Sequence, residues 1–133
     1  MVKYLTVKQV IMINAMVIQK HTPSEEVRVS NHSLLESAIH RPQQSAFGKD
    51  AYDTIWLKAA ALFHSLAMNH PFVNGNKRTA FASLYQFLWI NGFKLTASEQ
   101  NAEDFTLKMV NEKPSMRLAM IAKWIERNTK KRY

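Results

Sequence analysis

The sequence predicts a single all-α domain of about six helices. Apolar residues recur at helical spacing along most of the 133 residues, and strand signals are weak everywhere. Two segments, residues 53–69 and 77–90, are apolar over most of their circumference, which is typical of helices at the centre of a fold. A chain of this length can bury one real core, so one domain over residues 1–133 is expected.

The first helix begins with a capping box, in which Thr6 is the N-cap and Gln9 lies three residues later. One apolar stripe follows the cap: Val7, Val10, Ile11, Val17 and Ile18. Asn14 falls on this stripe, where a hydrophobic residue is expected.

The second helix is capped by Asn31 or Ser33, has Glu36 as the partner of its cap, and stops at Pro42. The residues after it indicate a loop or a short hairpin around Gly48.

The two central helices are joined by a short loop. The helix over 53–69 ends at His70, because a residue before proline is disfavoured in the helical region. The helix over 77–90 ends at a C-cap signal, Asn91-Gly92. Two further helices are expected at about 101–111 and 115–128, the last one beginning near Pro114-Ser115.

The joining loop has the composition of a phosphate site. It reads HPFVNGNKRTAF over residues 70–81. With Asn76 as N-cap, the amides of Lys77, Arg78 and Thr79 are unpaired donors at the positive end of a helix dipole. Gly75 lets the backbone approach a ligand closely, so the loop is suited to an anion such as phosphate.

Two other residues of the loop complete this hypothesis. His70 at the loop entrance is placed to act as a general base on a hydroxyl nucleophile. Phe72 is expected to anchor the loop to the core. Each residue alone has an ordinary structural explanation, and it is their combination between two apolar helices that favours a functional site.

Composition limits the class of protein. The net charge of +8 favours an anionic partner, although the basic end ERNTKKRY has the character of a solvated terminus. Cysteine is absent, which excludes disulfides and thiolate zinc sites. There is no apolar run of about 18 residues and no secretion signal, so a cytoplasmic protein without a membrane partner is expected.

The segment HPFVNGNKRTA resembles the signature of the Fic/Doc family, which reads His-x-Phe-x-Asp/Glu-Gly-Asn-Gly/Lys-Arg. The lysine form followed by Thr-Ala resembles the death-on-curing (Doc) branch of toxin–antitoxin systems. The similarity extends to YLTVKQVI, LLESAIHRPQ and ALFHSLAMNHPF, and so covers most of residues 4–95. It implies a compact helical bundle with a β-hairpin flap, expected around Gln43 to Lys49, along which family members bind the backbone of their target.

The resemblance also implies residue roles. His70 matches the family's catalytic base, and Gly75, Asn76, Lys77 and Arg78 match its phosphate-binding loop. The Doc branch implies a protein kinase that transfers the γ-phosphate of ATP to a threonine of elongation factor Tu.

The alternative activity is AMP transfer to a protein hydroxyl, as in most Fic proteins. Members with that activity have glycine at the position of Lys77 and a second arginine where this chain has Phe81. Both differences favour the kinase.

Asn74 is a departure from the family pattern, which has an acidic Mg²⁺ ligand at this position. An amide oxygen is a neutral, weaker ligand for a hard cation. The chain is therefore either a kinase that uses ATP and Mg²⁺ or a catalytically weakened binding module with the Fic fold. Asn14 is a second departure, because relatives often have histidine there.

Regulation is expected to come from a partner. The family's self-inhibitory pattern, Ser/Thr-x-x-x-Glu-Gly/Asn, is absent from the chain. A Phd-type antitoxin, folding as a helix in a groove of the toxin, is the implied inhibitor. The rival class is a nucleic-acid-binding protein or a ribonuclease toxin; it is supported by the charge, but the chain has no nucleic-acid-binding motif.

Overall fold

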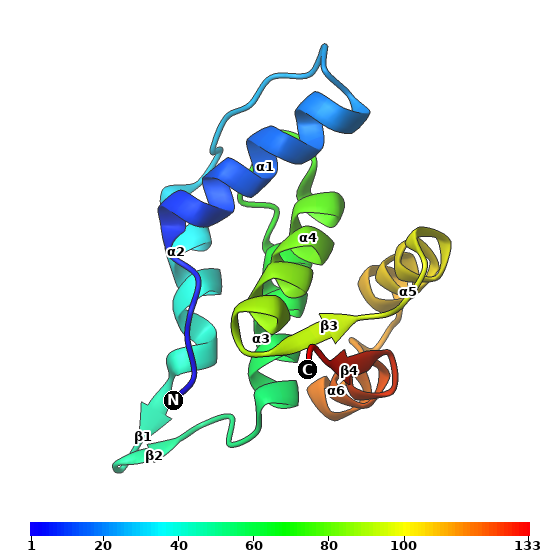
Figure 1. The fold of residues 1–133 in the computed structure, drawn as a ribbon. Coiled ribbons are helices and arrows are strands. Elements are labelled where there is room, and N and C mark those ends of the chain that lie inside the picture. Colours follow the sequence, from blue (N-terminus) through cyan, green and yellow to red (C-terminus); the bar gives the residue numbers. More distant parts are fainter.

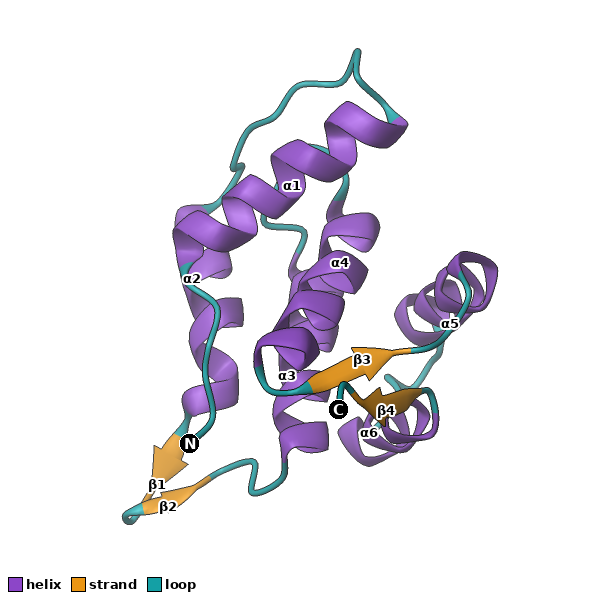
Figure 2. Ribbon diagram, in the orientation of Figure 1, coloured by secondary structure: helices purple, strands orange, loops and turns teal.

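A computed structural model describes residues 1–133 as six α-helices and two separate two-stranded sheets (Figures 1 and 2). The helices are α1 (Val7–His21), α2 (His32–His40), α3 (Ile55–Asn69), α4 (Asn76–Ile90), α5 (Glu99–Asn111) and α6 (Leu118–Arg127), with a 3-10 turn at Arg41–Gln43. The strands are β1 (Ser45–Ala46), β2 (Lys49–Asp50), β3 (Phe93–Leu95) and β4 (Thr129–Lys131). The predicted all-α class with about six helices and a small hairpin is confirmed. No helix is both long and apolar enough to cross a membrane.

The first two helices begin where the sequence predicts. The Thr6 hydroxyl accepts from the Gln9 amide at 3.2 Å, and the Gln9 side chain accepts from the Thr6 amide at 2.8 Å, which confirms the capping box. Asn31, and not Ser33, caps α2 by accepting from the Leu34 amide at 3.0 Å. Glu36 is exposed and plays no part in that cap.

Helices α3 and α4 form the centre of the fold, and α3 packs most extensively against α4 and α6. They run antiparallel, with the loop 70–75 joining their ends (Figure 1). Their facing sides are fully buried and supply much of the core, including Phe63, Leu66, Leu84 and Phe87. Burial of each such side chain contributes about 1.5–3 kcal/mol, so this packing holds the loop between two rigid helices.

The sheet formed by β3 and β4 is absent from the sequence prediction. Phe93 pairs with Lys131 and Leu95 with Thr129, so the last residues of the chain return to the end of α4. The C-terminal segment is therefore not a free solvated end, as its composition suggested, although its lysines are exposed. Helix α6 begins at Leu118, three residues later than predicted, with Arg117 at its N-cap.

The hairpin β1–β2 turns through Phe47 and Gly48, both with positive φ. The side chains at its base hold it against α3: Lys58, only 3% exposed, pairs with Asp50 at 3.1 Å. On the other side, the Arg41 guanidinium donates to the hydroxyls of Tyr52 at 3.0 Å and Ser65 at 2.8 Å. The hairpin is thus fixed at the end of α3 that is remote from the loop 70–75 (Figure 1).

Candidate functional site

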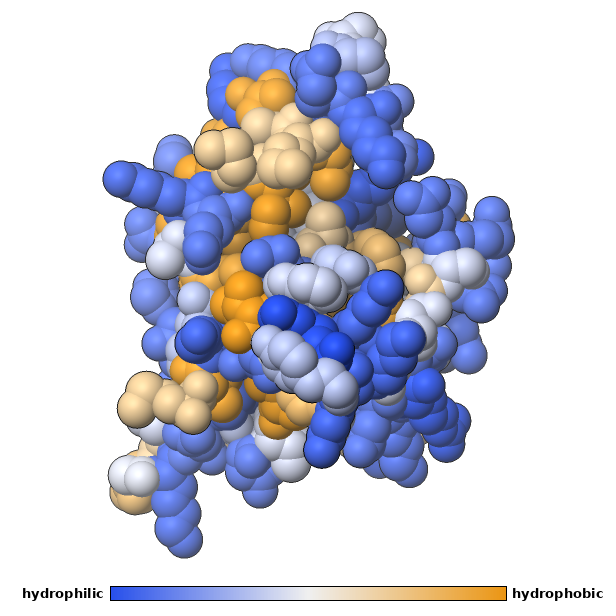
Figure 3. Space-filling model, viewed as in Figure 1, coloured by the Kyte–Doolittle hydropathy of each residue, from blue (hydrophilic) through white to orange (hydrophobic).

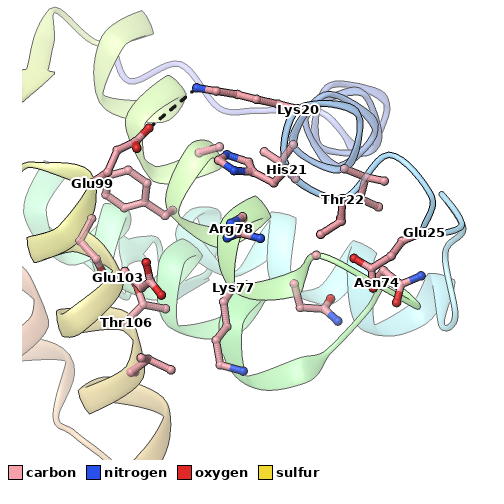
Figure 4. Close-up of a pocket in the computed structure, with 18 of the residues that line it drawn as sticks. Lys20, His21, Thr22, Glu25, Asn74, Lys77, Arg78, Glu99, Glu103 and Thr106 are labelled. Atoms are coloured by element: carbon pink, nitrogen blue, oxygen red, sulfur yellow. Dashed lines mark hydrogen bonds and ion pairs between the residues drawn. The ribbon is translucent and has the colours of Figure 1, made fainter.

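The predicted site residues lie in one cleft of about 830 Å³ between α1, the loop 70–75, α4 and α5. All six of them line it: His70, Asn74, Gly75, Asn76, Lys77 and Arg78. The cleft is partly polar, with cationic side chains at its centre and carboxylates toward both ends (Figure 4). It has the size and mixed lining of a site for a small charged ligand.

The loop is held in its conformation by two residues with positive φ and by two anchors. His70 at φ 49° ends α3, and Gly75 at φ 74° precedes α4. Phe72 is 3% exposed and fixes the loop to the core, as expected. The Asn76 side chain accepts from the Phe72 amide at 2.9 Å and donates to its carbonyl at 2.8 Å, which locks the turn from inside.

The prediction that Asn76 is the N-cap of α4 is wrong. Asn76 is the first helical residue, and Gly75 occupies the cap position without a side chain that could accept a hydrogen bond. The Thr79 amide is also not free, because it donates to the Gly75 carbonyl at 2.8 Å. The predicted set of free amides, residues 77–79, therefore loses Thr79, and the free amides begin closer to the N-terminus than predicted.

Four consecutive amides at the start of α4 have no acceptor within the chain, those of Gly75, Asn76, Lys77 and Arg78. They lie at the positive end of the helix dipole, and the side chains of Lys77 and Arg78 add two positive charges. Neither side chain forms an ion pair. This end of the cleft can bind an anion with several oxygens, such as a phosphate.

Helix α1 supports the loop through Asn14, whose side chain is fully buried. Its Nδ2 donates to the Asn74 carbonyl at 2.9 Å and to the Thr79 hydroxyl at 3.0 Å. The polar residue on the apolar stripe of α1 thus points at the loop 70–75, 60 residues away in the sequence. Its Oδ1 has no hydrogen-bond partner.

The segment between α1 and α2 runs beside the loop and pairs with it through a single antiparallel bridge. The Val73 amide donates to the Arg28 carbonyl at 2.9 Å, and the Ser30 amide donates to the Pro71 carbonyl at 2.8 Å. Val29 lies opposite Phe72 in an antiparallel bridge. Since peptide groups alternate in direction along a strand, those of Val27 and Val29 face away from the loop and form an open edge.

Asn74 extends this contact, because its Nδ2 donates to the Glu26 carbonyl at 3.0 Å. Its Oδ1 has no partner within the chain. Glu25 also lines the cleft, and Figure 4 shows its carboxylate beside Asn74. These two oxygen donors are the groups at this end of the cleft that could bind a hard cation.

The His70 side chain is exposed at the edge of the cleft and makes no hydrogen bond with the chain. It is therefore free to accept a proton from a ligand. Because α3 ends at Asn69 and the His70 backbone is left-handed, the backbone that carries the imidazole is fixed between α3 and the loop.

Several residues of the cleft were missed by the sequence analysis: Lys20, His21, Thr22, Glu25, Tyr85, Glu99, Glu103, Thr106 and Leu107. They come from the end of α1 and the segment that follows it, from α4 and from one face of α5 (Figure 4). Lys20 on α1 and Glu99 on α5 approach to 3.8 Å across the cleft mouth, as an exposed pair. Glu99 and Glu103 are four residues apart on α5, a spacing that places them on one face, but the sequence does not show what that face meets.

The hairpin predicted at Gln43 to Lys49 forms, but it contributes no residue to the cleft. Lys58, which anchors it, lies 12 residues before His70, or about 18 Å along the helix. The strand edge beside the loop belongs instead to residues 26–30. The expected role of the hairpin as the surface that aligns a target is therefore not supported by its position.

A second, shallow groove runs between α1 and α4 and is mainly apolar. The side chains of Met12 and Met16 line this groove and are 61% and 63% exposed. Ile13, Lys8 and Lys20 also line it. Figure 3 shows apolar surface over α1 on this face of the molecule. An exposed apolar patch with a charged rim is typical of a protein-binding surface.

Comparison with known proteins places these features in context. The model of the Fic/DOC family matches residues 4–88, which is more than half of the chain. A protein described as Toxin Doc, from Mycolicibacterium smegmatis (strain ATCC 700084 / mc(2)155), is 53% identical over 72 residues. The matched region is 54% of this chain and 55% of that relative, so the chain spans about half the length of the curated relative it matches.

Proposed function

This chain belongs to the Fic/DOC family, and we propose that it is the toxin of a toxin–antitoxin pair. In this proposal it is a protein kinase that transfers the γ-phosphate of ATP to a threonine of elongation factor Tu and so arrests translation. The identity to a Doc toxin over half the chain supports the toxin role.

The observation that carries the proposal is the group of four free amides at the start of α4, with Lys77, Arg78 and His70 in the same cleft. Phosphoryl transfer requires positioning and charge stabilisation more than covalent chemistry by the protein. Amides of a helix N-terminus are fixed dipoles that need no reorganisation when charge develops on the phosphoryl oxygens.

His70 is the general base in this mechanism. Its imidazole accepts the proton of the threonine hydroxyl while the hydroxyl oxygen forms a bond to the γ-phosphorus. The bond from that phosphorus to the bridging β-phosphate oxygen breaks, and ADP leaves. Arg78 and the amides of residues 75–78 hold the phosphoryl oxygens during the transfer.

Lys77 and Phe81 favour γ-phosphate transfer over the alternative, AMP transfer. Both side chains line the cleft. Lys77 fills space and adds charge where AMP-transferring relatives have glycine, and Phe81 supplies an apolar ring where they have a second arginine. An α-phosphate therefore has one fewer cationic group to bind it.

Mg²⁺ is the expected companion of ATP, and the oxygen donors of Asn74 and Glu25 fit it in part. Mg²⁺ retains several waters and is often held by nucleotide phosphates plus one or two protein oxygens. The free Oδ1 of Asn74 and the neighbouring Glu25 carboxylate can supply those oxygens. When bound, the ion would neutralise charge on the β- and γ-phosphates.

The alternative, a catalytically weakened binding module, has the same cleft but does not catalyse phosphate transfer. In it, the neutral Asn74 holds the ion too loosely for turnover, and the protein acts only by binding its partner. Asn74→Asp restores the family's acidic ligand and separates the two cases.

The target is aligned by the strand edge at Val27 and Val29 in this proposal. An extended segment that pairs with this edge would lie directly beside the loop 71–74 and present its hydroxyl near His70. The exposed side chain of Val27 offers an apolar contact to that segment.

The antitoxin, of the Phd type, binds the groove between α1 and α4 as a helix. Exposed methionines adapt to an apolar helix face, and the lysines at the rim favour an acidic partner. The net charge of +8 supports the same choice.

The deciding experiment incubates the protein with elongation factor Tu and either γ-labelled or α-labelled ATP. Label from the γ position alone, lost in His70→Ala, is the expected result. Label from the α position would favour AMP transfer. No label in the native chain, with transfer restored by Asn74→Asp, would favour the weakened binding module.

A further inference from the structure

Burial of the polar Asn14 side chain lowers the stability of the fold, and apolar packing does not explain why asparagine occupies this position. It is 0% exposed and lies among apolar residues of α1, close to Val10 and Ile18. Its Oδ1 is buried without a partner, and an unsatisfied buried acceptor costs about 1–3 kcal/mol. A leucine would fill the same stripe without that cost, so the two hydrogen bonds of Nδ2 are what the residue provides.

One of these bonds goes to the phosphate-binding loop and the other to the body of α4. The bond to the Asn74 carbonyl, at 2.9 Å, fixes the peptide that immediately precedes the free Gly75 amide. The bond to the Thr79 hydroxyl, at 3.0 Å, joins α1 to the second turn of α4. Thr79 itself does not line the cleft.

Close packing makes this contact sensitive to small movements. A Cβ at Gly75 would lie 3.3 Å from Asn14 Nδ2 and 3.2 Å from Ile18 Cγ1. The loop therefore rests directly on α1, with no space between them. Asn74 is held from both ends, at its carbonyl by Asn14 and at its Nδ2 by the Glu26 carbonyl.

We propose that Asn14 is a positioning residue for the anion-binding loop. By holding the Asn74 carbonyl, it sets the direction of the amides of residues 75–78 and keeps Asn74 Oδ1 turned toward the cleft. The inference rests on the proposed function in one respect, that the loop binds the phosphates of ATP.

The test compares three variants of the full chain: Asn14→Ala, Asn14→His and the matched control Thr79→Val. Binding of ATP with Mg²⁺ is measured by calorimetry, and stability is measured by urea unfolding. Asn14→Ala is expected to weaken ATP binding about tenfold, equivalent to the loss of one hydrogen bond to an aligned group. Asn14→His, which retains a ring donor, is expected to recover part of that loss.

Thr79→Val removes the acceptor of the other bond and leaves the Asn74 contact in place. It is expected to lower stability while the Kd for ATP changes less than about twofold, because the loop is not touched. If Thr79→Val weakens ATP binding as much as Asn14→Ala does, Asn14 acts only through general stability and the proposal is overturned.

Hydrogen exchange without nucleotide separates this inference from the proposed function. Asn14→Ala is expected to speed exchange in residues 71–79 more than Thr79→Val does. If the native chain binds no ATP, the proposed kinase fails, and the exchange comparison still decides whether Asn14 orders the loop. Equal exchange in both variants would overturn the role of Asn14. Should Asn14→Ala not fold, Asn14→His is compared with Thr79→Val in the same assays.

Discussion

Lys77 and Phe81 lie one turn apart on α4, and both line the same wall of the cleft. Residues at this spacing face the same side of a helix, so a ligand that reaches one is next to the other. The pair therefore sets the size and charge of the space beside the free amides at the start of α4. In AMP-transferring relatives the same two positions carry glycine and arginine.

Exchanging the pair is expected to change the group that is transferred. The double variant Lys77→Gly/Phe81→Arg opens space for an α-phosphate and adds a cation to hold it. Transfer of α-label to the target should appear, and transfer of γ-label should fall at least tenfold. Unchanged γ transfer in the double variant would show that other residues determine the choice.

His70→Ala is expected to lower phosphate transfer by about 10²–10⁴-fold and to leave ATP affinity within about twofold, because the imidazole acts on the hydroxyl. Transfer is measured with saturating ATP and affinity by calorimetry. His40→Ala is the matched control, an exposed histidine at the end of α2 outside the cleft. A large loss of ATP affinity in His70→Ala would contradict the role of a base.

Gly75→Ala is expected to lower the free energy of unfolding by about 1–3 kcal/mol and to weaken ATP binding. The substitution meets both a positive φ of 74° and close contacts with Ile18 and Asn14. Gly92→Ala is the control, since φ there is 90° but no atom lies within 4 Å of the added Cβ. Urea unfolding should show the greater loss for Gly75→Ala, and equal losses would show that the contacts with α1 are unimportant.

The antitoxin groove is tested by Met16→Glu, which places a negative charge where an acidic, apolar helix is proposed to bind. Affinity for the cognate antitoxin should fall by at least tenfold, while ATP binding is unchanged, because Met16 does not line the cleft. Met120→Glu is the control, a residue of similar exposure on α6. Equal antitoxin affinity for both variants would place the partner elsewhere.

Stability is expected to fall on acidification because of His64. Burial, and then the Arg41 guanidinium, lowers the pKa of His64 below its usual value. Arg41 lies 3.2 Å from Nδ1, and Ser115 lies 3.2 Å from Nε2. The unfolded chain therefore binds a proton at a higher pH than the folded chain does, so the stabilising effect is complete above about pH 6.5 and is lost as the pH falls toward the lowered pKa.

The check is urea unfolding of the native chain and His64→Asn at several pH values from about 7.5 to 5. The native chain should lose more stability over this interval than the variant, which has no imidazole at this position. The two proteins differ only at position 64, so the difference between their curves reports the contribution of His64. Parallel curves would show that His64 does not contribute.

The features that could be predicted from the sequence are those that depend on neighbouring residues. The Thr6 capping box, the end of α3 at His70 and the turn at Gly48 are local, and each is confirmed. The loop residues 70–78 also lie together because they are consecutive. Their composition alone was therefore enough to predict an anion site in this loop.

The features that could not be predicted depend on contacts between distant segments. The partner of Asn14 is 60 residues away, and β4 pairs with a strand that precedes two further helices. The hairpin lies where the sequence predicts it, but its distance from the loop 70–75 could not be predicted, because that distance depends on which end of α3 carries it. The wall formed by Glu99 and Glu103 likewise appears only when α5 packs across the cleft.

The direct connection of α3 to α4 has a consequence for how the chain folds. These helices form the largest contact in the fold and are separated by residues 70–75 alone, so they can meet after closing a very short loop. Pairing of β3 with β4 and docking of α1 require much longer closures, which are slower. The turn that we propose to bind phosphate would then also be the turn around which the nucleus forms. Substitutions chosen to alter catalysis in this segment should change the rate of folding as well.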